Sequence, residues 1–102
     1  MSHIRLLEKM RDFLNGNISP EEFAFEFEQD LNESAYELKN ENEELFLLLN
    51  DDMPELCANF EPDNGERLNY SDVYHNENHL RRETNKVYIE ALELLTFKKA
   101  TA

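Results

Sequence analysis

The stretch SPEEFAFEFEQDLNESAYELKN, residues 19 to 40, constrains the fold of this chain most. It opens with the spacing of a capping box, in which the Ser19 hydroxyl accepts from the amide of Glu22 while the Glu22 carboxylate reaches back. Pro20 would occupy the first helical position, where a missing amide costs no hydrogen bond. The stretch therefore predicts an amphipathic helix from residue 20 to about 40. Its apolar residues recur every three or four positions, at Phe23, Phe27, Leu31, Ala35 and Leu38.

Most of the rest of the chain is also expected to be helical, with residues 61–75 mostly irregular, because only two glycines and three prolines interrupt the chain and no apolar–polar alternation is sustained. A first helix should cover about residues 2–15, with Gly16 as a left-handed cap, and a last helix about 76–97. The region 42–60 contains Pro54, which predicts either two helices, about 42–50 and 53–60, or one helix kinked at the proline. The capping-box spacing of Asp52 and Glu55 favours the break.

The apolar residues of each predicted helix fall on one face, as the core of a bundle requires. The sequence therefore predicts one all-α domain over residues 1–102, a small antiparallel four-helix bundle whose third helix is a candidate for a break near Pro54. Phe25 falls outside its stripe, so that it either packs against another helix or is an exposed contact for a partner. The other predicted core positions are Ile4, Leu7, Phe13 and Leu14 with Leu6 or Met10 beside them, then Leu45, Leu48, Leu49, Met53, Leu56, Cys57 and Phe60, and finally Leu80, Val87, Ala91, Leu94 and Leu95.

Acidic side chains are concentrated in the middle of the chain. Residues 19–63 contain fifteen of them against Lys39 alone, and the whole chain has a net charge of −13. Such a block repels nucleic acid and acidic membranes, and it attracts a basic surface. The alternative interpretation is a solvated helix surface that keeps a small acidic protein in solution.

The compartment is indicated by what the sequence lacks. Cys57 is the only cysteine, so no intrachain disulfide can form and a reducing compartment suits the chain. The N-terminal stretch MSHIRLLEKMRDFL carries charges at short intervals and has no signal-peptide core, and no later run approaches the length of a membrane span. We therefore expect a cytoplasmic protein.

Enzyme chemistry is hard to build from these residues. His75, His79 and Glu83 have the spacing that would place three metal ligands on one helix face, but a histidine pair at a helix start is usually polar surface. The sequence contains no glycine-rich phosphate-binding loop. We expect no enzyme, no cofactor and no resident metal. The nearby basic residues are expected to pair with acids of their own surface rather than with phosphate: Arg81, Arg82 and Lys86.

The stretch ANFEPDNGERLNY, residues 58–70, holds carboxylates on a predicted turn. Pro62 fixes one backbone dihedral, and Asn64 and Gly65 tolerate the positive dihedral that ends such a turn. Glu61 and Asp63 therefore become candidates for a rigid acidic projection that follows the third helix.

Three pieces of sequence carry a family resemblance. MRDFLNGNISPEEF, ANFEPD and NKVYIEALELL, in that order, resemble the bacterial self-protective colicin-like immunity family. The resemblance implies a four-helix antiparallel bundle that binds the C-terminal nuclease domain of a cognate toxin, a tRNase, one to one. The inhibitor is then expected to cover the basic active-site cleft with acidic side chains that stand where RNA phosphates would lie. The toxin would belong to a colicin, to contact-dependent growth inhibition or to another polymorphic toxin system.

Residue by residue, the resemblance places Glu61 and Asp63 of FEPD at the acids that enter the toxin's cleft. Ala58 departs from the pattern, because an acid can stand at that position in the family. The segment after the turn is also longer, and its side chains are expected to replace the missing acid and to set specificity. The further candidate partner contacts are Glu66, Tyr70 and Asp72, with Asp52 and Glu55 before the turn.

Two other functions stay open. One is an acidic nucleic-acid mimic that inhibits a different DNA- or RNA-binding protein, with the acids of residues 19–60 acting as a long ladder of charge. The other is a small helical metal-binding or adaptor domain that uses His75 and His79.

Overall fold

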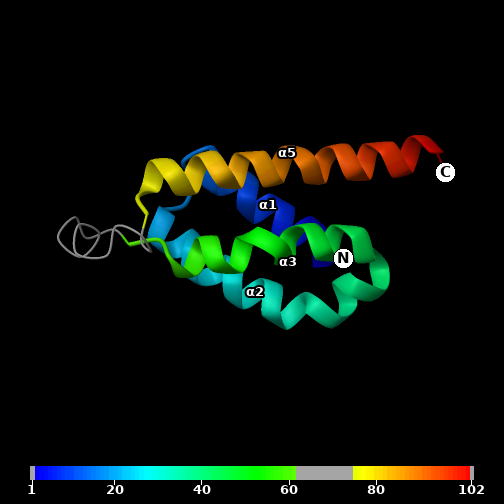
Figure 1. Ribbon diagram of the computed structural model, residues 1–102, viewed down its shortest axis with the longest axis horizontal. Coiled ribbons are helices and arrows are strands. Elements are labelled where there is room, and N and C mark those ends of the chain that lie inside the picture. The colour runs from blue at the N-terminus through cyan, green and yellow to red at the C-terminus, as the bar shows by residue number, and fades with distance from the viewer. Residues whose placement is uncertain (1, 62–74, 102) are drawn as a thin grey trace.

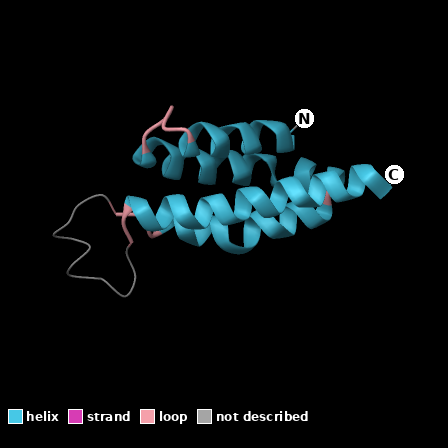
Figure 2. Ribbon diagram, turned by 90° about the horizontal axis from the view of Figure 1, so that it is seen from above, coloured by secondary structure: helices cyan, strands magenta, loops and turns pink. Residues whose placement is uncertain are grey.

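The computed structural model describes residues 2–61 and 75–101, and within these ranges it contains four helices and no strand (Figures 1 and 2). The predicted all-α fold is confirmed. Each helix packs against two others, in the closed order α1, α2, α3, α5 and back to α1. The elements are α1 (Ser2–Leu14), α2 (Pro20–Glu41), α3 (Glu43–Ala58) and α5 (Glu77–Thr101).

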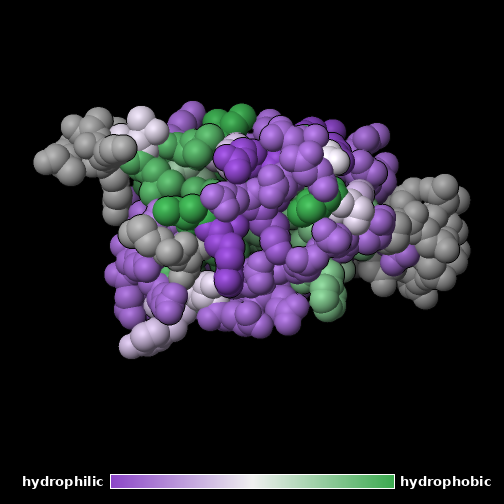
Figure 3. Space-filling model, turned by 180° about the vertical axis from the view of Figure 1, so that it is seen from behind, coloured by the Kyte–Doolittle hydropathy of each residue, from purple (hydrophilic) through white to green (hydrophobic). Residues whose placement is uncertain are grey.

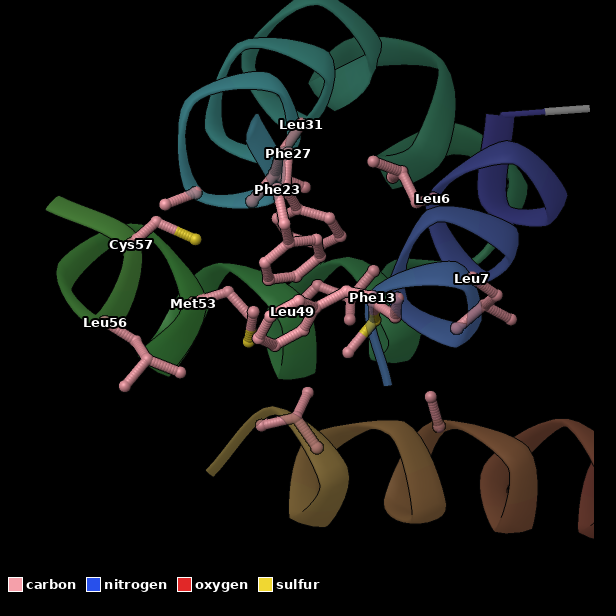
Figure 4. Packing of buried hydrophobic residues seen from close by; sticks show 14 of the residues in the cluster. Leu6, Leu7, Phe13, Phe23, Phe27, Leu31, Leu49, Met53, Leu56 and Cys57 are labelled. Carbon is pink, nitrogen blue, oxygen red and sulfur yellow. The ribbon is translucent and has the colours of Figure 1, made fainter. Parts of the chain in front are cut away.

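The core is built around aromatic rings from α1 and α2. The rings of Phe13 and Phe23 stack with centroids 4.4 Å apart and planes 6° apart, and Phe27 lies 5.2 Å from Phe23 (Figure 4). All three side chains are fully buried, so each contributes several kcal/mol of stability on the usual scale of about 3–5 kcal/mol for Phe→Ala. The same cluster includes Leu6, Leu7, Met10, Ala24, Leu31, Leu38, Leu45, Leu49, Met53, Leu56, Cys57, Leu80, Val87 and Ala91.

The junction between α1 and α2 is as predicted. Gly16 has φ 81°, and its amide donates to the Phe13 carbonyl at 3.0 Å, while the Asn17 amide donates to that of Asp12 at 2.8 Å. These two bonds form a Schellman cap, and only glycine adopts this φ without strain. Ser19 then caps α2, because its Oγ accepts from the Glu22 amide at 3.1 Å.

A single residue connects α2 to α3. The Asn42 amide donates to the Leu38 carbonyl at 2.8 Å, which closes α2. Its side-chain Oδ1 accepts from the Leu45 amide at 3.1 Å, which caps the N-terminus of α3. One asparagine therefore satisfies backbone groups at the ends of both helices.

Of the two alternatives for the region 42–60, the structure has the single helix, because α3 runs from Glu43 to Ala58 with Pro54 inside it, and the division into two helices is wrong. The Asp52–Glu55 spacing does not cap a new helix. Leu49, Met53 and Leu56, which lie on one face before and after the proline, are all buried in the core. The burial of this continuous apolar face offsets the lost amide hydrogen bond, whose cost is about 3 kcal/mol.

The helix faces differ from prediction at a few positions. Ile4 is 46% exposed, whereas Leu6 and Met10, expected only beside the α1 stripe, are fully buried. On α2, Ser34 is buried and Ala35 lies only partly covered. The buried set on α1 recurs at Leu6, Met10 and Phe13, so this helix is rotated slightly from the predicted orientation.

The face of the molecule opposite to the one seen in Figure 1 is mainly polar. Figure 3 shows that hydrophilic residues cover most of this face, with hydrophobic residues gathered mostly towards the end where α5 terminates. Across the described residues, no helix combines the length and the apolar character that crossing a membrane requires.

Candidate functional site

A groove of about 590 Å³ lies between the end of α3 and the start of α5, the green and yellow helix ends of Figure 1. Four carboxylates line it against one ammonium group, so its lining is acidic. The C-terminus of α3, which carries a partial negative charge, is close by at Ala58. The lining residues are Asp52, Glu55, Leu56, Asn59, His75, His79, Glu83, Lys86, Val87 and Glu90.

A backbone clamp joins two residues that line the groove, Asn59 and His75. The Glu61 amide donates to the His75 carbonyl at 3.1 Å, and the His75 amide donates to the Asn59 carbonyl at 3.0 Å. Phe60 and His75 thereby form a parallel bridge. Residues 61 and 75 are held side by side, although thirteen residues separate them in sequence.

His75 and His79 lie against each other in the groove. Their ring centroids are 4.6 Å apart, and the planes are inclined by 41°. Burial lowers the pKa of His75, and repulsion from His79 lowers it further, while a backbone hydrogen bond at Leu56 acts in the opposite direction. Nε2 of His75 is buried without a hydrogen-bond partner among the described residues. His75 is therefore neutral at pH 7.

Two basic side chains of α5 pair with acids of their own helix. Lys86 Nζ lies 3.0 Å from a Glu83 carboxylate oxygen, and this bond is the main cause that lowers the pKa of Glu83. Arg81 pairs with Glu77 at 2.9 Å. The predicted local pairing is thus confirmed for Arg81 and Lys86. Arg82 instead contacts Nδ1 of His79 at 3.2 Å.

The predicted metal-ligand pattern does not assemble in the described part of the chain. No group of three or more His, Cys, Asp or Glu side chains there is arranged to hold a metal ion. His75 and His79 do meet, but the Glu83 carboxylate is turned to Lys86.

The predicted partner-binding residues are only partly brought together. Asp52 and Glu55 are exposed and line the groove from α3. Glu61 is half-buried and joins the clamp through its backbone amide. Sequence reasoning missed Glu90, which lines the groove from α5, and no local pattern marks it, because its place in the site depends on the packing of α5 against α3. The remaining predicted residues, Asp63, Glu66, Tyr70 and Asp72, lie outside the described residues.

Cys57 is a packing residue, as predicted. Its side chain is buried in the core, and burial together with the charge of Glu28 raises the pKa of its thiol to about 12. The thiolate that nucleophilic or redox chemistry requires is therefore scarce at neutral pH.

Comparison of the chain with protein-family models, with curated proteins and with solved structures finds no significant match in any of the three.

Proposed function

We propose that this protein is an immunity protein that neutralises a toxin nuclease, by placing carboxylates in the basic cleft that would otherwise bind RNA. It would act in the cytoplasm as an antiparallel four-helix bundle that binds one toxin domain. The tRNase class and the roles of Glu61 and Asp63 in this proposal come from the resemblance to the colicin-like immunity family.

The acidic groove is the observation that carries the proposal. Asp52 and Glu55 are exposed on α3, and Glu90 is exposed on α5, so two packed helices hold their backbones in place. A nuclease cleft presents lysines and arginines to bind phosphates. Carboxylates form charge-assisted hydrogen bonds with the same groups, and a preorganised arrangement loses little entropy on binding.

The backbone clamp supports a direct role for the turn after α3. The clamp holds Glu61 beside His75, which lines the acidic groove just before the start of α5. In the proposed complex Glu61 and Asp63 enter the toxin's active site, and Asp52 and Glu55 contact basic residues at its rim. Inhibition is then direct occlusion of the RNA-binding cleft.

The test uses a toxin nuclease domain encoded immediately upstream of this gene. Calorimetry with the purified domain should show tight one-to-one binding, and co-expression should protect cells. The double variant Glu61→Lys/Asp63→Lys should lose binding by at least a thousandfold, because two buried charge pairs become repulsive contacts. Asp52→Lys/Glu55→Lys should lose about tenfold to a hundredfold.

The matched control is Glu8→Lys/Glu93→Lys, which makes the same change in net charge at exposed positions outside the groove. It should slow association only slightly. A failure to protect against every toxin nuclease encoded next to the gene would overturn the proposal.

The second candidate is a nucleic-acid mimic that inhibits a different DNA- or RNA-binding protein. The observation in its favour is that exposed acids continue along α2, at Glu21, Glu22 and Glu33. Such a ladder distributes the binding energy, so the Glu61→Lys/Asp63→Lys variant would retain most of its affinity. Loss spread evenly over acid reversals in α2 and α3 would favour this function over a plug at the turn.

A further inference from the structure

The outer face of α2 carries two large aromatic side chains that the core does not use. Phe25 is 73% exposed and Tyr36 is 81% exposed. They are eleven residues apart, three helical turns, so they point in the same direction about 16 Å apart along the axis. Helix α2 packs against α1 and α3 and lies on the opposite side of the bundle from α5 (Figure 1). This surface is therefore separate from the groove.

Polar residues complete the stripe between the two rings. Gln29 and Asn32 fall between Phe25 and Tyr36 on the same exposed face, and the Gln29 amide donates to Glu33 at 3.5 Å. The packing alternative for Phe25 is thus wrong, because its ring is exposed. We call the four residues Phe25, Gln29, Asn32 and Tyr36 the α2 aromatic face.

Carboxylates border the α2 aromatic face on both sides. From helical geometry, Glu21 and Glu28 fall on one side, and Glu22 and Glu33 on the other. Among the described residues no ion pair involves any of these four acids. The acids of α2 that Lys9 does neutralise, Glu26 and Asp30, lie towards α1 instead, at 2.8 and 3.1 Å from its Nζ.

Charge restricts what can cover such a face. Nucleic acid and an acidic membrane are repelled by the bordering carboxylates, and a second copy of this chain, with its net charge of −13, is repelled as well. A basic protein surface is attracted. Arginine satisfies both parts of the face, because its guanidinium stacks on an aromatic ring while its N–H groups donate to carboxylates at the border.

The protein already contains one contact of this kind. The Arg81 guanidinium carbon lies 4.5 Å from the centre of the Phe13 ring, and the same group pairs with Glu77. The geometry points to the α2 aromatic face as a docking surface for an arginine-bearing basic protein, with one guanidinium on Phe25 and another on Tyr36. This surface does not depend on the proposed immunity function, and it lies away from the groove on which that function rests.

Octa-arginine and octa-lysine peptides, titrated into the ¹⁵N-labelled full chain, provide the test. We expect octa-arginine to shift the amide signals of residues 25–36 and to bind several-fold more tightly there than octa-lysine, which has equal charge but stacks less well. Phe25→Ala/Tyr36→Ala should weaken octa-arginine binding about tenfold, because each ring over a guanidinium is worth roughly a two- to fivefold change.

Two controls separate stacking from general attraction. Phe25→Leu/Tyr36→Leu keeps apolar bulk and should lose the preference for arginine as the alanine variant does. Leu47→Ala/Ile89→Ala removes exposed apolar side chains elsewhere and should change nothing. All these positions are exposed, so circular dichroism should show folded variants.

Three outcomes would overturn the inference: equal binding of the two peptides at residues 25–36, no effect of the aromatic substitutions, or concentration-dependent dimerisation that Phe25→Ala/Tyr36→Ala abolishes. The Glu61→Lys/Asp63→Lys variant should retain the shifts at residues 25–36. A failure of the proposed immunity function and a failure of the α2 aromatic face to bind arginine would therefore give different results.

Discussion

Nη1 of Arg81 donates to the carbonyl oxygen of Phe13 at 2.7 Å, and its guanidinium covers the ring of the same residue. The Phe13 carbonyl belongs to the last turn of α1 and also accepts from the Gly16 amide, so Arg81 adds a second bond to this helix end. A residue of α5 thus caps α1 and shields its core aromatic ring from solvent. Glu77 holds the guanidinium in place through two further bonds, at 3.1 and 2.9 Å.

Replacing Arg81 should therefore destabilise the bundle. We expect Arg81→Ala to lower the free energy of unfolding by about 1.5–3 kcal/mol, since it leaves a charge-assisted hydrogen bond unmade. Arg81→Lys should recover only part of this loss, because an ammonium cannot stack and fork in the same way. Urea denaturation measures both. Arg82→Ala, at an exposed neighbouring position, is the control and should stay within about 0.5 kcal/mol; equal effects at the two positions would contradict the capping role.

The folded protein should become more stable when the hydroxyl group of Thr84 is removed. Its side chain is fully buried, and Oγ1 has no hydrogen-bond partner among the described residues. Thr84→Val keeps the shape and removes the desolvated hydroxyl, so we expect about 1 kcal/mol of added stability. Thr84→Ala removes a core methyl as well and should destabilise. Thermal unfolding of the two variants and of the unsubstituted protein measures both effects. A melting temperature of Thr84→Val below that of the unsubstituted protein would show that the hydroxyl has a hydrogen-bond partner.

The protein should lose stability as the pH falls through the range in which histidine takes up a proton. The pKa of His75 is lowered in the folded state, so the unfolded chain binds this proton more tightly. Stability from this group is complete above the unfolded pKa of about 6.5, and it declines as the pH falls from there towards the folded pKa. Denaturation midpoints at pH 7.5 and pH 5 should differ less in His75→Gln than in the unsubstituted chain.

Substitution of His79 tests why the pKa of His75 is lowered. Because repulsion between the two rings contributes to the shift, His79→Gln should raise the pKa of His75 part of the way towards its ordinary value. Burial, the larger cause, remains in that variant. The Cε1 proton of His75, followed by NMR against pH, reports this change. An unchanged titration curve would assign the whole shift to burial.

Cys57 should be inert in the folded protein. Because burial raises the pKa of its thiol to about 12, an aromatic disulfide reagent at pH 8 should modify it only through opening of the core. In denaturing urea the reaction should be complete within the mixing time. Rapid modification of the native chain would show that the region around α3 opens far more often than its packing indicates.

Local signals in the sequence identified the parts of the fold that depend on near neighbours. Gly16 and Ser19 end one helix and start the next as predicted, because both caps are made by residues within a few positions. Pro54 left the prediction open between one helix and two, and core burial of Met53 and Leu56, which outweighs the local preference, decides for one. The contact of Arg81 with Phe13 joins residues 68 apart, and no local pattern encodes it.

The candidate site likewise has one part that the sequence indicates and another that depends on how the helices pack. Glu61 and the acids Asp52 and Glu55 were identified because charge and turn residues are visible in the sequence. The groove itself was not, because it requires the end of α3 and the start of α5 to be packed together. Glu90, on a different helix, becomes part of the site only through that packing.

Asn42 has a consequence for how this protein can diversify. Because this one residue ends α2 and starts α3, an insertion or deletion there would turn α3 by roughly 100° about its axis. Leu45 and Leu49 would leave the core, and the groove carboxylates ten or more residues later would face a different direction. Homologues should therefore vary in residue identity along α3 while the length of this link stays constant.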